Sequence, residues 1–108
     1  MPSTLTQIQS LAVADKIRVS DHAYEELGKD GIFATDVIEA LSNARLVEDY
    51  PDAQRGPTVL VLCSLRNGRG VHCVWGIHSS RPDVCVLITA YLPDVAQWSK
   101  DLLKRIKP

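Results

Sequence analysis

The sequence lacks the patterns that mark membrane, secreted and disulfide-bonded proteins. No apolar run reaches about 18 residues, so neither a membrane segment nor a membrane partner is expected. The first residues show neither the basic segment nor the apolar stretch of a secretory signal, so we expect a cytoplasmic location. The three cysteines, Cys63, Cys73 and Cys85, show no C-x-x-C spacing. A disulfide framework or zinc site is therefore not predicted, and we interpret them as small apolar residues on strands.

An excess of positive charge is also missing. The chain has 12 Lys and Arg against 13 Asp and Glu, which gives a formal net charge of −1. Proteins that bind nucleic acid usually carry excess Lys and Arg, so only a local basic patch can attract RNA here. His22, His72 and His78 are too widely spaced for a metal site. No metal or other cofactor is predicted.

What the chain does contain is the composition of one small globular domain. Hydrophobic residues make up 45% of the 108 residues and charged residues 23%. Both fractions are ordinary for a protein with a single core, and a chain of this length can bury one. We predict one α+β domain over residues 1–108.

The N-terminal part carries helical spacing. Leu5, Ile8 and Leu11 recur at the interval of a helix, and Ser20 is placed as the N-cap of a second helix. That helix is expected to end at Gly28 or Gly31. The predicted elements are a helix over residues 4–14, an extended piece at 17–19, the helix after Ser20, and a third helix from 34 or 35 to 43.

The C-terminal part carries strand patterns and turn signals. Asn67-Gly68 is a strong hairpin signal, and Asp94 can cap a last helix that contains Trp98 and runs to Lys107. Helices followed by a meander predict a four-stranded, mainly antiparallel sheet with the helices packed on one face. The predicted strands are residues 46–50, 58–65, 70–77 and 84–92.

Alternation along the last two strands places three polar residues together. A turn at residues 79–82 sets His72 opposite Thr89, so that His72, Thr89 and Tyr91 share the open face of the sheet. The core side of the last strand is then predicted to hold Val84, Val86, Ile88 and Ala90.

The strand over residues 58–65 has two possible registers. A two-residue turn at Asn67-Gly68 sets Cys63 opposite His72, whereas a three-residue loop with a bulge sets Ser64 opposite His72. We prefer the second register. It keeps four apolar residues on the core side, namely Val59, Val61, Cys63 and Leu65.

Several stretches in a set order resemble an uncharacterised bacterial family, domain of unknown function 4258. They span about residues 17–98. The family's helix usually reads Ser-x-His-Ala-x-x-Arg, and Glu26 stands at its last position here. The matching stretches are Ser20-Asp21-His22-Ala23, Gly31-Ile32 with Asp36-Val37, Glu48-Asp49-Tyr50-Pro51, Leu60-Val61-Leu62, Val71-His72-Cys73-Val74, and Ile88-Thr89-Ala90-Tyr91 with Pro93 and Trp98.

That family is distantly similar to the RelE and barnase group of metal-independent ribonucleases, which includes bacterial toxins. The resemblance implies a RelE- or barnase-like fold, a cleavage activity on RNA and, in a toxin setting, a small antitoxin protein as partner. Metal-free RNA cleavage needs a general base and a general acid, and histidine suits either role near neutral pH. We therefore predict His22, His72 and Tyr91 as catalytic residues, with the two histidines as the acid/base pair and Tyr91 near the phosphate, which it can orient or to which it can donate a proton.

Three further residues are predicted to bind the substrate. Arg55 and Arg66 have the side chain best shaped for phosphate, and Thr89 lies on the same face as His72. Each candidate also has a structural interpretation. His22 can pack its helix on the sheet, His72 can bond a neighbour, and loop arginines are commonly only solvated.

A second hypothesis is a non-catalytic module of the same fold that binds a protein, a ligand or a second copy on the open face. Leu60, Leu62 and Leu87 are predicted on that face. Exposed leucines in one place indicate that a partner, a homodimer contact or another helix covers them.

Overall fold

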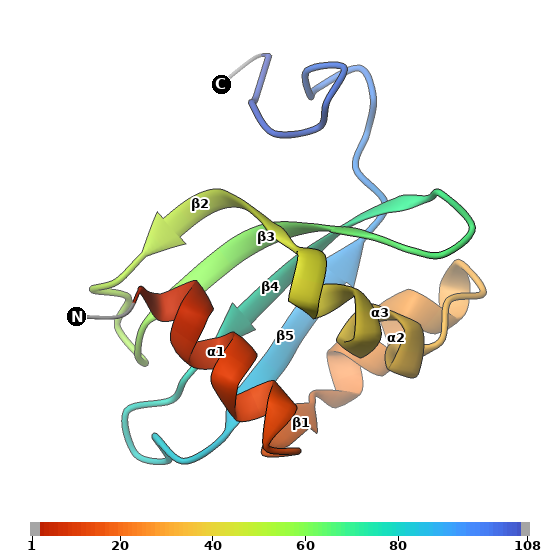
Figure 1. The fold of residues 1–108 in the computed structure, drawn as a ribbon. Coiled ribbons are helices and arrows are strands. Elements are labelled where there is room, and N and C mark those ends of the chain that lie inside the picture. Colours follow the sequence, from red (N-terminus) through yellow and green to blue (C-terminus); the bar gives the residue numbers. More distant parts are fainter. Residues whose placement is uncertain (1–2, 107–108) are drawn as a thin grey trace.

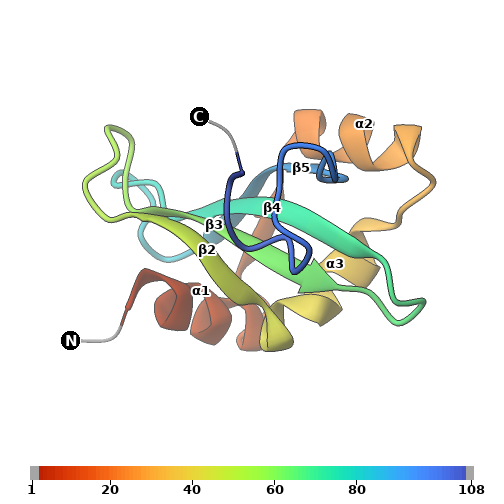
Figure 2. The same ribbon diagram turned by 90° about the horizontal axis from the view of Figure 1, so that it is seen from above.

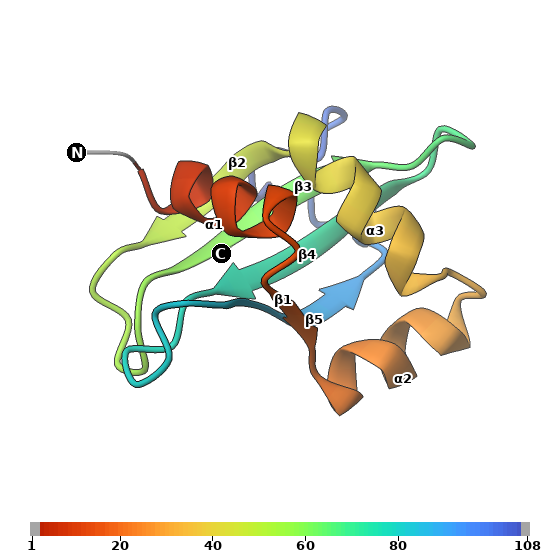
Figure 3. The same cartoon turned by 60° about the horizontal axis from the view of Figure 1, so that its bottom comes forward.

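The computed structural model describes residues 3–106 as a twisted sheet with helices on one side and the C-terminal residues on the other (Figure 1). This is an α+β architecture, as predicted. Seen from the helix side, α1 and α3 lie across the sheet, and α2 lies beside β5 (Figure 3). In chain order the elements are α1 (Thr4–Val13), β1 (Ile17–Val19), α2 (Asp21–Lys29), α3 (Ala34–Ala40), a 3-10 turn (Leu41–Asn43), β2 (Arg45–Tyr50), β3 (Thr58–Ser64), β4 (Gly70–Gly76) and β5 (Cys85–Tyr91).

Two helices, α1 and α2, begin after a serine that caps them. The Ser3 hydroxyl accepts a hydrogen bond from the Thr6 N–H at 3.1 Å, and the Ser20 hydroxyl accepts one from the Ala23 N–H at 3.0 Å. Such caps satisfy N–H groups that a helix leaves unpaired at its start. The Ser20 hydroxyl also donates to the Ile88 carbonyl oxygen at 2.7 Å. The cap of α2 therefore ties this helix to β5.

The sheet has five strands in the order β1-β5-β4-β3-β2, so the expectation of four strands was wrong. β1 pairs in parallel with β5, from Ile17 opposite Cys85 to Val19 opposite Leu87, and the other neighbours are antiparallel. The extended piece at 17–19 was predicted, but its pairing was not. The hydrogen bond from Ser20 to Ile88, just beyond this pair of strands, joins residues 68 positions apart. No local pattern reports a pairing over such a distance in sequence.

The hairpin between β3 and β4 has the predicted three-residue loop. Gly68 takes a φ of 88°, and the Leu65 N–H donates to the Arg69 carbonyl oxygen at 2.9 Å. The face assignment was correct, because Val59, Val61, Cys63 and Leu65 are all buried in the core. The predicted pair was wrong by two residues: Leu62, rather than Ser64, lies opposite His72. The loop closes between Leu65 and Arg69, which sets the strand register two residues away from the predicted one.

The pairing of β4 with β5 contains an irregularity that sequence alternation cannot show. Val74 lies opposite Thr89 but Trp75 lies opposite Leu87, so Ile88 is an extra residue on β5. The bulge reverses the alternation, because one inserted residue moves the following side chains to the other face. The register is also one residue away from the predicted one before the bulge, where Gly76 lies opposite Val86, so Tyr91, and not Thr89, is opposite His72. The predicted core set of β5 was also wrong before the bulge, where Cys85 and Leu87 are the buried residues.

The main core lies between the sheet and the helices. Trp75, Ile8, Val37 and Leu87 are fully buried there. Burial of one such aliphatic side chain stabilises the fold by about 1.5–3 kcal/mol, so this layer is the chief source of stability. The three cysteines are buried on β3, β4 and β5 and are unpaired.

The predicted C-terminal helix is not present in residues 94–106. These residues form turns and one antiparallel bridge between Trp98 and Arg105, and they cross the open face of the sheet (Figure 2). The Asp94 side chain accepts from the Ala96 N–H at 2.9 Å, and the Asp101 side chain accepts from the Leu103 N–H at 3.1 Å. Side chains that bond nearby N–H groups compete with helix formation. Lys107, the expected last helical residue, lies outside the described residues.

Candidate functional site

A buried histidine occupies the open face of the sheet. His72, on β4, is fully buried, and both of its ring nitrogens have partners. Nε2 is 2.8 Å from the Leu102 carbonyl oxygen, and Nδ1 is 3.3 Å from the Tyr91 hydroxyl. A carbonyl oxygen can only accept, so Nε2 carries the hydrogen. Nδ1 then accepts the hydrogen of the Tyr91 hydroxyl.

This histidine is neutral in the folded protein. Burial lowers the pKa of His72, and nearby Arg105 lowers it further, against the opposing effects of the Leu102 hydrogen bond and of Glu48. Burial also raises the pKa of Tyr91, so its phenol stays protonated at neutral pH. The pair is therefore a neutral imidazole and a neutral phenol, joined by the hydrogen bond that the Tyr91 hydroxyl donates to His72 Nδ1.

Trp98 covers the histidine. Its side chain is only 4% exposed, and its ring meets the His72 ring edge to face with centroids 4.4 Å apart. On the other side, the Arg105 guanidinium lies 4.7 Å from the Trp98 ring centroid. Both contacts are favourable, since aromatic rings prefer edge-to-face neighbours and attract cations over their faces. The C-terminal segment is thus attached to the sheet at His72.

Leu102 provides the second point of attachment. An added Cβ at Gly70 would lie 3.0 Å from Leu102 Cδ1 and 3.2 Å from Leu62 Cδ1, so the absence of a side chain at Gly70 makes room for Leu102. Leu102 itself takes a φ of 64°, which a bulky residue adopts only under strain of roughly 1–3 kcal/mol. The hydrogen bond from His72 and the packing over Gly70 offset this strain.

A charged group completes the cluster at its open edge. Glu48 accepts from Arg105 at both carboxylate oxygens, with distances of 2.9 Å to Nε and 3.2 Å to Nη2. The Tyr50 hydroxyl donates to Glu48 Oε1 at 2.5 Å. Arg105 lowers the pKa of Glu48 most strongly, followed by the Tyr50 hydrogen bond, so the carboxylate is ionised at neutral pH. The same hydrogen bond raises the pKa of Tyr50.

Together these residues form what we call the Glu48–Tyr91 cluster. It contains an ionised carboxylate, a guanidinium, two protonated phenols and a neutral imidazole. Such a set offers a general base, an anion-binding cation and a proton donor within one patch. The members of the cluster are Glu48, Tyr50, His72, Tyr91, Trp98 and Arg105.

Sequence reasoning missed four members of the cluster as site residues: Glu48, Tyr50, Trp98 and Arg105. Glu48 and Tyr50 are two positions apart on a strand, a spacing that puts both side chains on one face, so this signal was present. Arg105 gave no such signal, because it was placed on a helix that the chain does not form.

The other predicted residues lie at different places. His22 is exposed on α2, and within residues 3–106 it forms no hydrogen bond or ion pair that would join it to His72. Thr89 is half-buried on the face that carries His72, opposite Val74. The structure therefore brings His72, Tyr91 and Thr89 to one face, while His22 stands apart from the cluster's hydrogen bonds.

The two predicted phosphate binders are at opposite ends of β3. Arg55 is exposed in the loop before Thr58, and it lines a cavity on the open face. Arg66 follows Ser64 and is 2.5 Å from Glu39 on α3, so it points to the helix side. Since β3 spans seven residues, or roughly 20 Å, the two arginines cannot hold one phosphate together.

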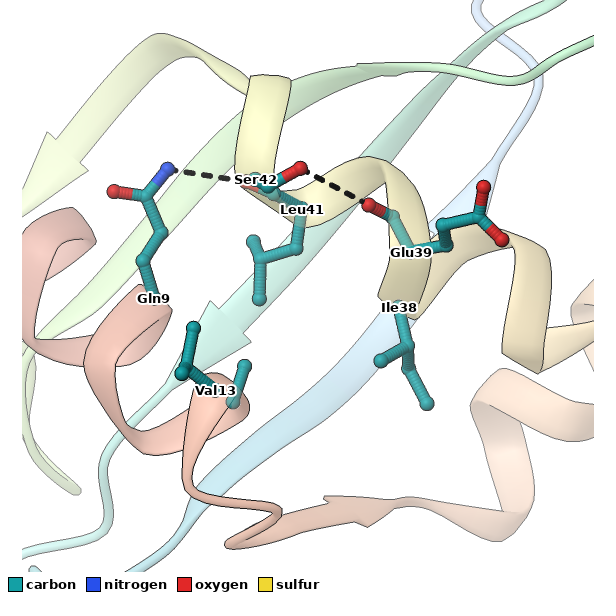
Figure 4. Close-up of a pocket in the computed structure, with 7 residues that line it drawn as sticks. Gln9, Val13, Ile38, Glu39, Leu41 and Ser42 are labelled. Carbon is teal, nitrogen blue, oxygen red and sulfur yellow. Dashed lines mark hydrogen bonds between the residues drawn. The ribbon is translucent and has the colours of Figure 1, made fainter.

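A larger groove lies between α1 and α3 on the helix side (Figure 4). Its volume is about 380 Å³, and it is closed at one end where Gln9 Nε2 donates to the Leu41 carbonyl oxygen at 3.0 Å. Val13 and Ile38 supply apolar walls, and Glu39 is its one charged side chain. Its lining residues include no acid and base pair.

Comparison with known proteins gives a family match. Residues 19–92 match the family described as domain of unknown function (DUF4258). No curated protein and no solved structure matches the chain. Glu48, Tyr50, His72 and Tyr91 lie within the matched stretch, and Trp98 and Arg105 lie beyond it. In residues 3–106, no helix is long and apolar enough to cross a membrane, and no group of His, Cys, Asp and Glu is placed to hold a metal ion.

Proposed function

Since the chain belongs to the family described as domain of unknown function (DUF4258), we propose a function from its site: metal-independent cleavage of RNA by a RelE- or barnase-like domain. The observation that carries the proposal is the joint placement of Glu48, Arg105 and Tyr91 at the edge of the open face. These side chains match the base, the phosphate-binding cation and the acid that such a reaction needs.

The base in this proposal is Glu48. Its pKa is lowered, so the carboxylate is ionised and can accept the proton of a ribose 2′-hydroxyl, whose oxygen then attacks the adjacent phosphorus. Two N–H groups of Arg105 hold the carboxylate in place. The remaining N–H groups of its guanidinium are available to the phosphate oxygens, on which negative charge grows as the bond forms.

The acid is Tyr91. Its raised pKa keeps the phenol protonated, and the hydroxyl turns its hydrogen from His72 Nδ1 to the 5′-oxygen that leaves the phosphorus. The products are a 2′,3′-cyclic phosphate and a free 5′-hydroxyl. His72 is a positioning residue in this scheme, because it is buried and its Nδ1 holds the Tyr91 hydroxyl. The catalytic role predicted for His22 stays a prediction.

The reaction needs no cofactor, because every proton and charge is handled by side chains of the cluster. The resemblance to toxin-type ribonucleases adds a small antitoxin protein as a proposed partner, and RNA as the proposed substrate. The net charge of −1 does not argue against RNA as substrate, because the phosphate would meet the local positive charge of the Arg105 guanidinium.

A cleavage assay with a labelled single-stranded RNA in the presence of EDTA tests the proposal. Glu48→Gln keeps the shape of the side chain and removes its basicity, so we expect the rate to fall by about 10²–10⁴-fold. Glu39→Gln is the matched control, because Glu39 is also a carboxylate paired with an arginine, but it is exposed on the helix side. Equal rates for wild type and Glu48→Gln would contradict the proposal. A His22→Ala variant in the same assay decides whether that histidine takes part.

The second candidate is a non-catalytic module that binds a protein or a second copy. It is favoured by two large apolar side chains in contact with solvent on the helix side, Val13 at 87% exposure and Phe33 at 73%. Sedimentation of the purified chain tests the homodimer form. Self-association that Phe33→Glu abolishes supports it, and a monomer at all concentrations that cleaves RNA argues for the first candidate.

A further inference from the structure

A small cavity lies on the open face at the other end of β4, away from the Glu48–Tyr91 cluster. Its floor is formed by Thr58, Val86 and Ile88, and Arg55 and His78 stand at its rim. We propose that this cavity binds one nucleotide of a single-stranded RNA, with the base on the floor and the phosphate at the rim. The inference rests on the proposed function, because it supplies that reaction with a substrate-binding subsite.

The size of the cavity suits a single base. Its volume is about 180 Å³. Pockets for larger ligands usually enclose roughly 300–1,000 Å³, so a ligand of several rings would not fit. A planar base with its sugar outside the cavity remains as an occupant of suitable size.

The floor is apolar and firmly placed. Ile88 is 41% exposed there, although it is a large hydrophobic residue in a strand. An added Cβ at Gly76 would lie 3.0 Å from Ile88 Cδ1 and 3.2 Å from Thr58 Oγ1, so these two side chains close over the glycine. The Thr58 hydroxyl donates to the Gly56 carbonyl oxygen at 3.0 Å. The resulting flat apolar surface suits the face of a base.

The rim offers two hydrogen-bond donors that have no partner within residues 3–106. Arg55 forms no ion pair or side-chain hydrogen bond in this part of the chain. His78 Nδ1 accepts from the Ser80 N–H at 3.1 Å, so in the neutral ring the hydrogen is on Nε2, which stays free to donate. A guanidinium and an imidazole N–H side by side are a donor set for a phosphate.

The two rim residues are held together by their backbones. The Ser79 N–H donates to the Arg55 carbonyl oxygen at 2.9 Å, and the Ile77 N–H donates to the Pro57 carbonyl oxygen at 3.0 Å. Between them Gly56 takes a φ of 134°, and an added Cβ would lie 2.1 Å from the Ile77 carbonyl oxygen. The loops that carry Arg55 and His78 are therefore joined before any ligand arrives, which reduces the entropy lost on binding.

The cavity and the cluster lie along one path. Gly76 is four residues after His72 on β4, a separation of roughly 13 Å. Val74 and Thr89 are half-buried between them on the same face. A short single strand that lies along β4 can thus place one nucleotide in the cavity while a neighbouring phosphate reaches Arg105. Thr89, predicted to contact substrate, is then on its route.

Binding of a short fluorescein-labelled RNA, measured by anisotropy in the Glu48→Gln background, tests the inference without interference from cleavage. We expect Arg55→Ala to weaken binding by about tenfold, because one charge-assisted contact to phosphate is lost. Arg66→Ala is the matched control, since that arginine points to the helix side, and it should bind as its parent does. Ile88→Ala should also weaken binding, whereas amide signals of Gly76 should shift with AMP more than with inorganic phosphate.

The outcomes separate this inference from the proposed function. If RNA binds through Arg55 but neither wild type nor Glu48→Gln cleaves it, the cavity is a nucleotide-binding site and the proposed ribonuclease activity is wrong. If wild type cleaves RNA but Arg55→Ala and Arg66→Ala bind RNA equally well, the proposal that the cavity binds a nucleotide is wrong, and the proposed ribonuclease activity stands. No RNA binding by wild type overturns the cavity as well.

Discussion

Trp98→Ala is the substitution that best tests how the C-terminal segment is attached to the sheet. Trp98 is 4% exposed and packs between the ring of His72 and the guanidinium of Arg105. Its removal takes away both ring contacts and leaves space above His72. Within the described residues 94–106, the one bridge joins two residues of the segment itself, so the segment is held to the sheet by contacts such as those of Trp98, Leu102 and Arg105, and we expect its docking to fail when the central one is removed.

The expected cost is about 3 kcal/mol. Replacing a buried Trp by Ala costs about 3–5 kcal/mol in a protein core, and the low end applies because Arg105, on one side of the ring, is exposed. The value includes the edge-to-face contact with His72, worth about 0.5–1.5 kcal/mol. A second effect is electrostatic. Burial is the chief cause of the lowered pKa of His72, so exposure of the ring should raise that pKa toward its ordinary value.

Urea denaturation and NMR titration of the imidazole signals measure the two effects separately. Val95→Ala is the matched control, because Val95 is 79% exposed in the same segment and its truncation should change stability by less than about 0.5 kcal/mol. If Trp98→Ala behaves as Val95→Ala does in urea and the pKa of His72 stays low, Trp98 does not cover His72. A raised pKa with little loss of stability would show that the segment detaches locally while the sheet stays folded.

Two other experiments concern the protonation of His72 and the backbone at two glycines. First, the lowered pKa of His72 means that, as the pH falls, the unfolded chain takes up a proton before the folded chain does. The free energy of unfolding should therefore fall as the pH drops below about 6.5. Denaturation midpoints from about pH 7.5 to pH 5.5 should show this fall in wild type and not in His72→Gln, and His22→Gln, at an exposed histidine, is the control. Second, Gly56→Ala should destabilise the fold by more than about 3 kcal/mol, since its Cβ would lie 2.1 Å from a carbonyl oxygen. Gly28→Ala, within α2, should stabilise the fold by about 0.5–1 kcal/mol, because no atom lies within 4 Å of the added Cβ. The melting temperatures of the two variants should therefore shift in opposite directions.

Local signals predicted the elements that depend on local chemistry. Ser20 caps α2 as expected, because its hydroxyl can accept a hydrogen bond from an N–H group that the first turn of the helix leaves unpaired. Asn67-Gly68 lies in the predicted three-residue loop, because Gly68 supplies the positive φ that the loop needs. Apolar alternation then placed β3 and β4 on the correct faces. In each case the information lies within a few residues of the feature.

Features that depend on distant partners were not predicted. The bulge at Ile88 exists only in relation to β4, and nothing in the sequence of β5 distinguishes it from a regular strand. The prediction that His72 and Tyr91 share the open face nevertheless holds, because a one-residue error in register and the one-residue bulge add up to two residues and leave the parity at Tyr91 unchanged. The same parity failed at Leu87, which lies before the bulge and belongs to the core.

The C-terminal segment explains both the error in fold and the incompleteness of the predicted site. Val95, Trp98 and Leu102 have helical spacing, but Trp98 is used against His72 and Leu102 against Gly70, which lie on the sheet rather than on a helix neighbour. The leucines expected to need a partner, Leu60 and Leu62, are buried on the face that this segment crosses.

This arrangement has a consequence for the site. Arg105 reaches Glu48 only because Trp98 and Leu102 hold the segment over β4, so the cation and the base of the proposed reaction come from parts of the chain 57 positions apart. Any change that detaches the segment should therefore remove the phosphate-binding cation while the carboxylate stays on β2. Trp98→Ala and Arg105→Ala should then impair RNA cleavage to a similar extent, although Trp98 itself touches no substrate. If Trp98→Ala still cleaves RNA but Arg105→Ala does not, Arg105 reaches Glu48 without the support of Trp98.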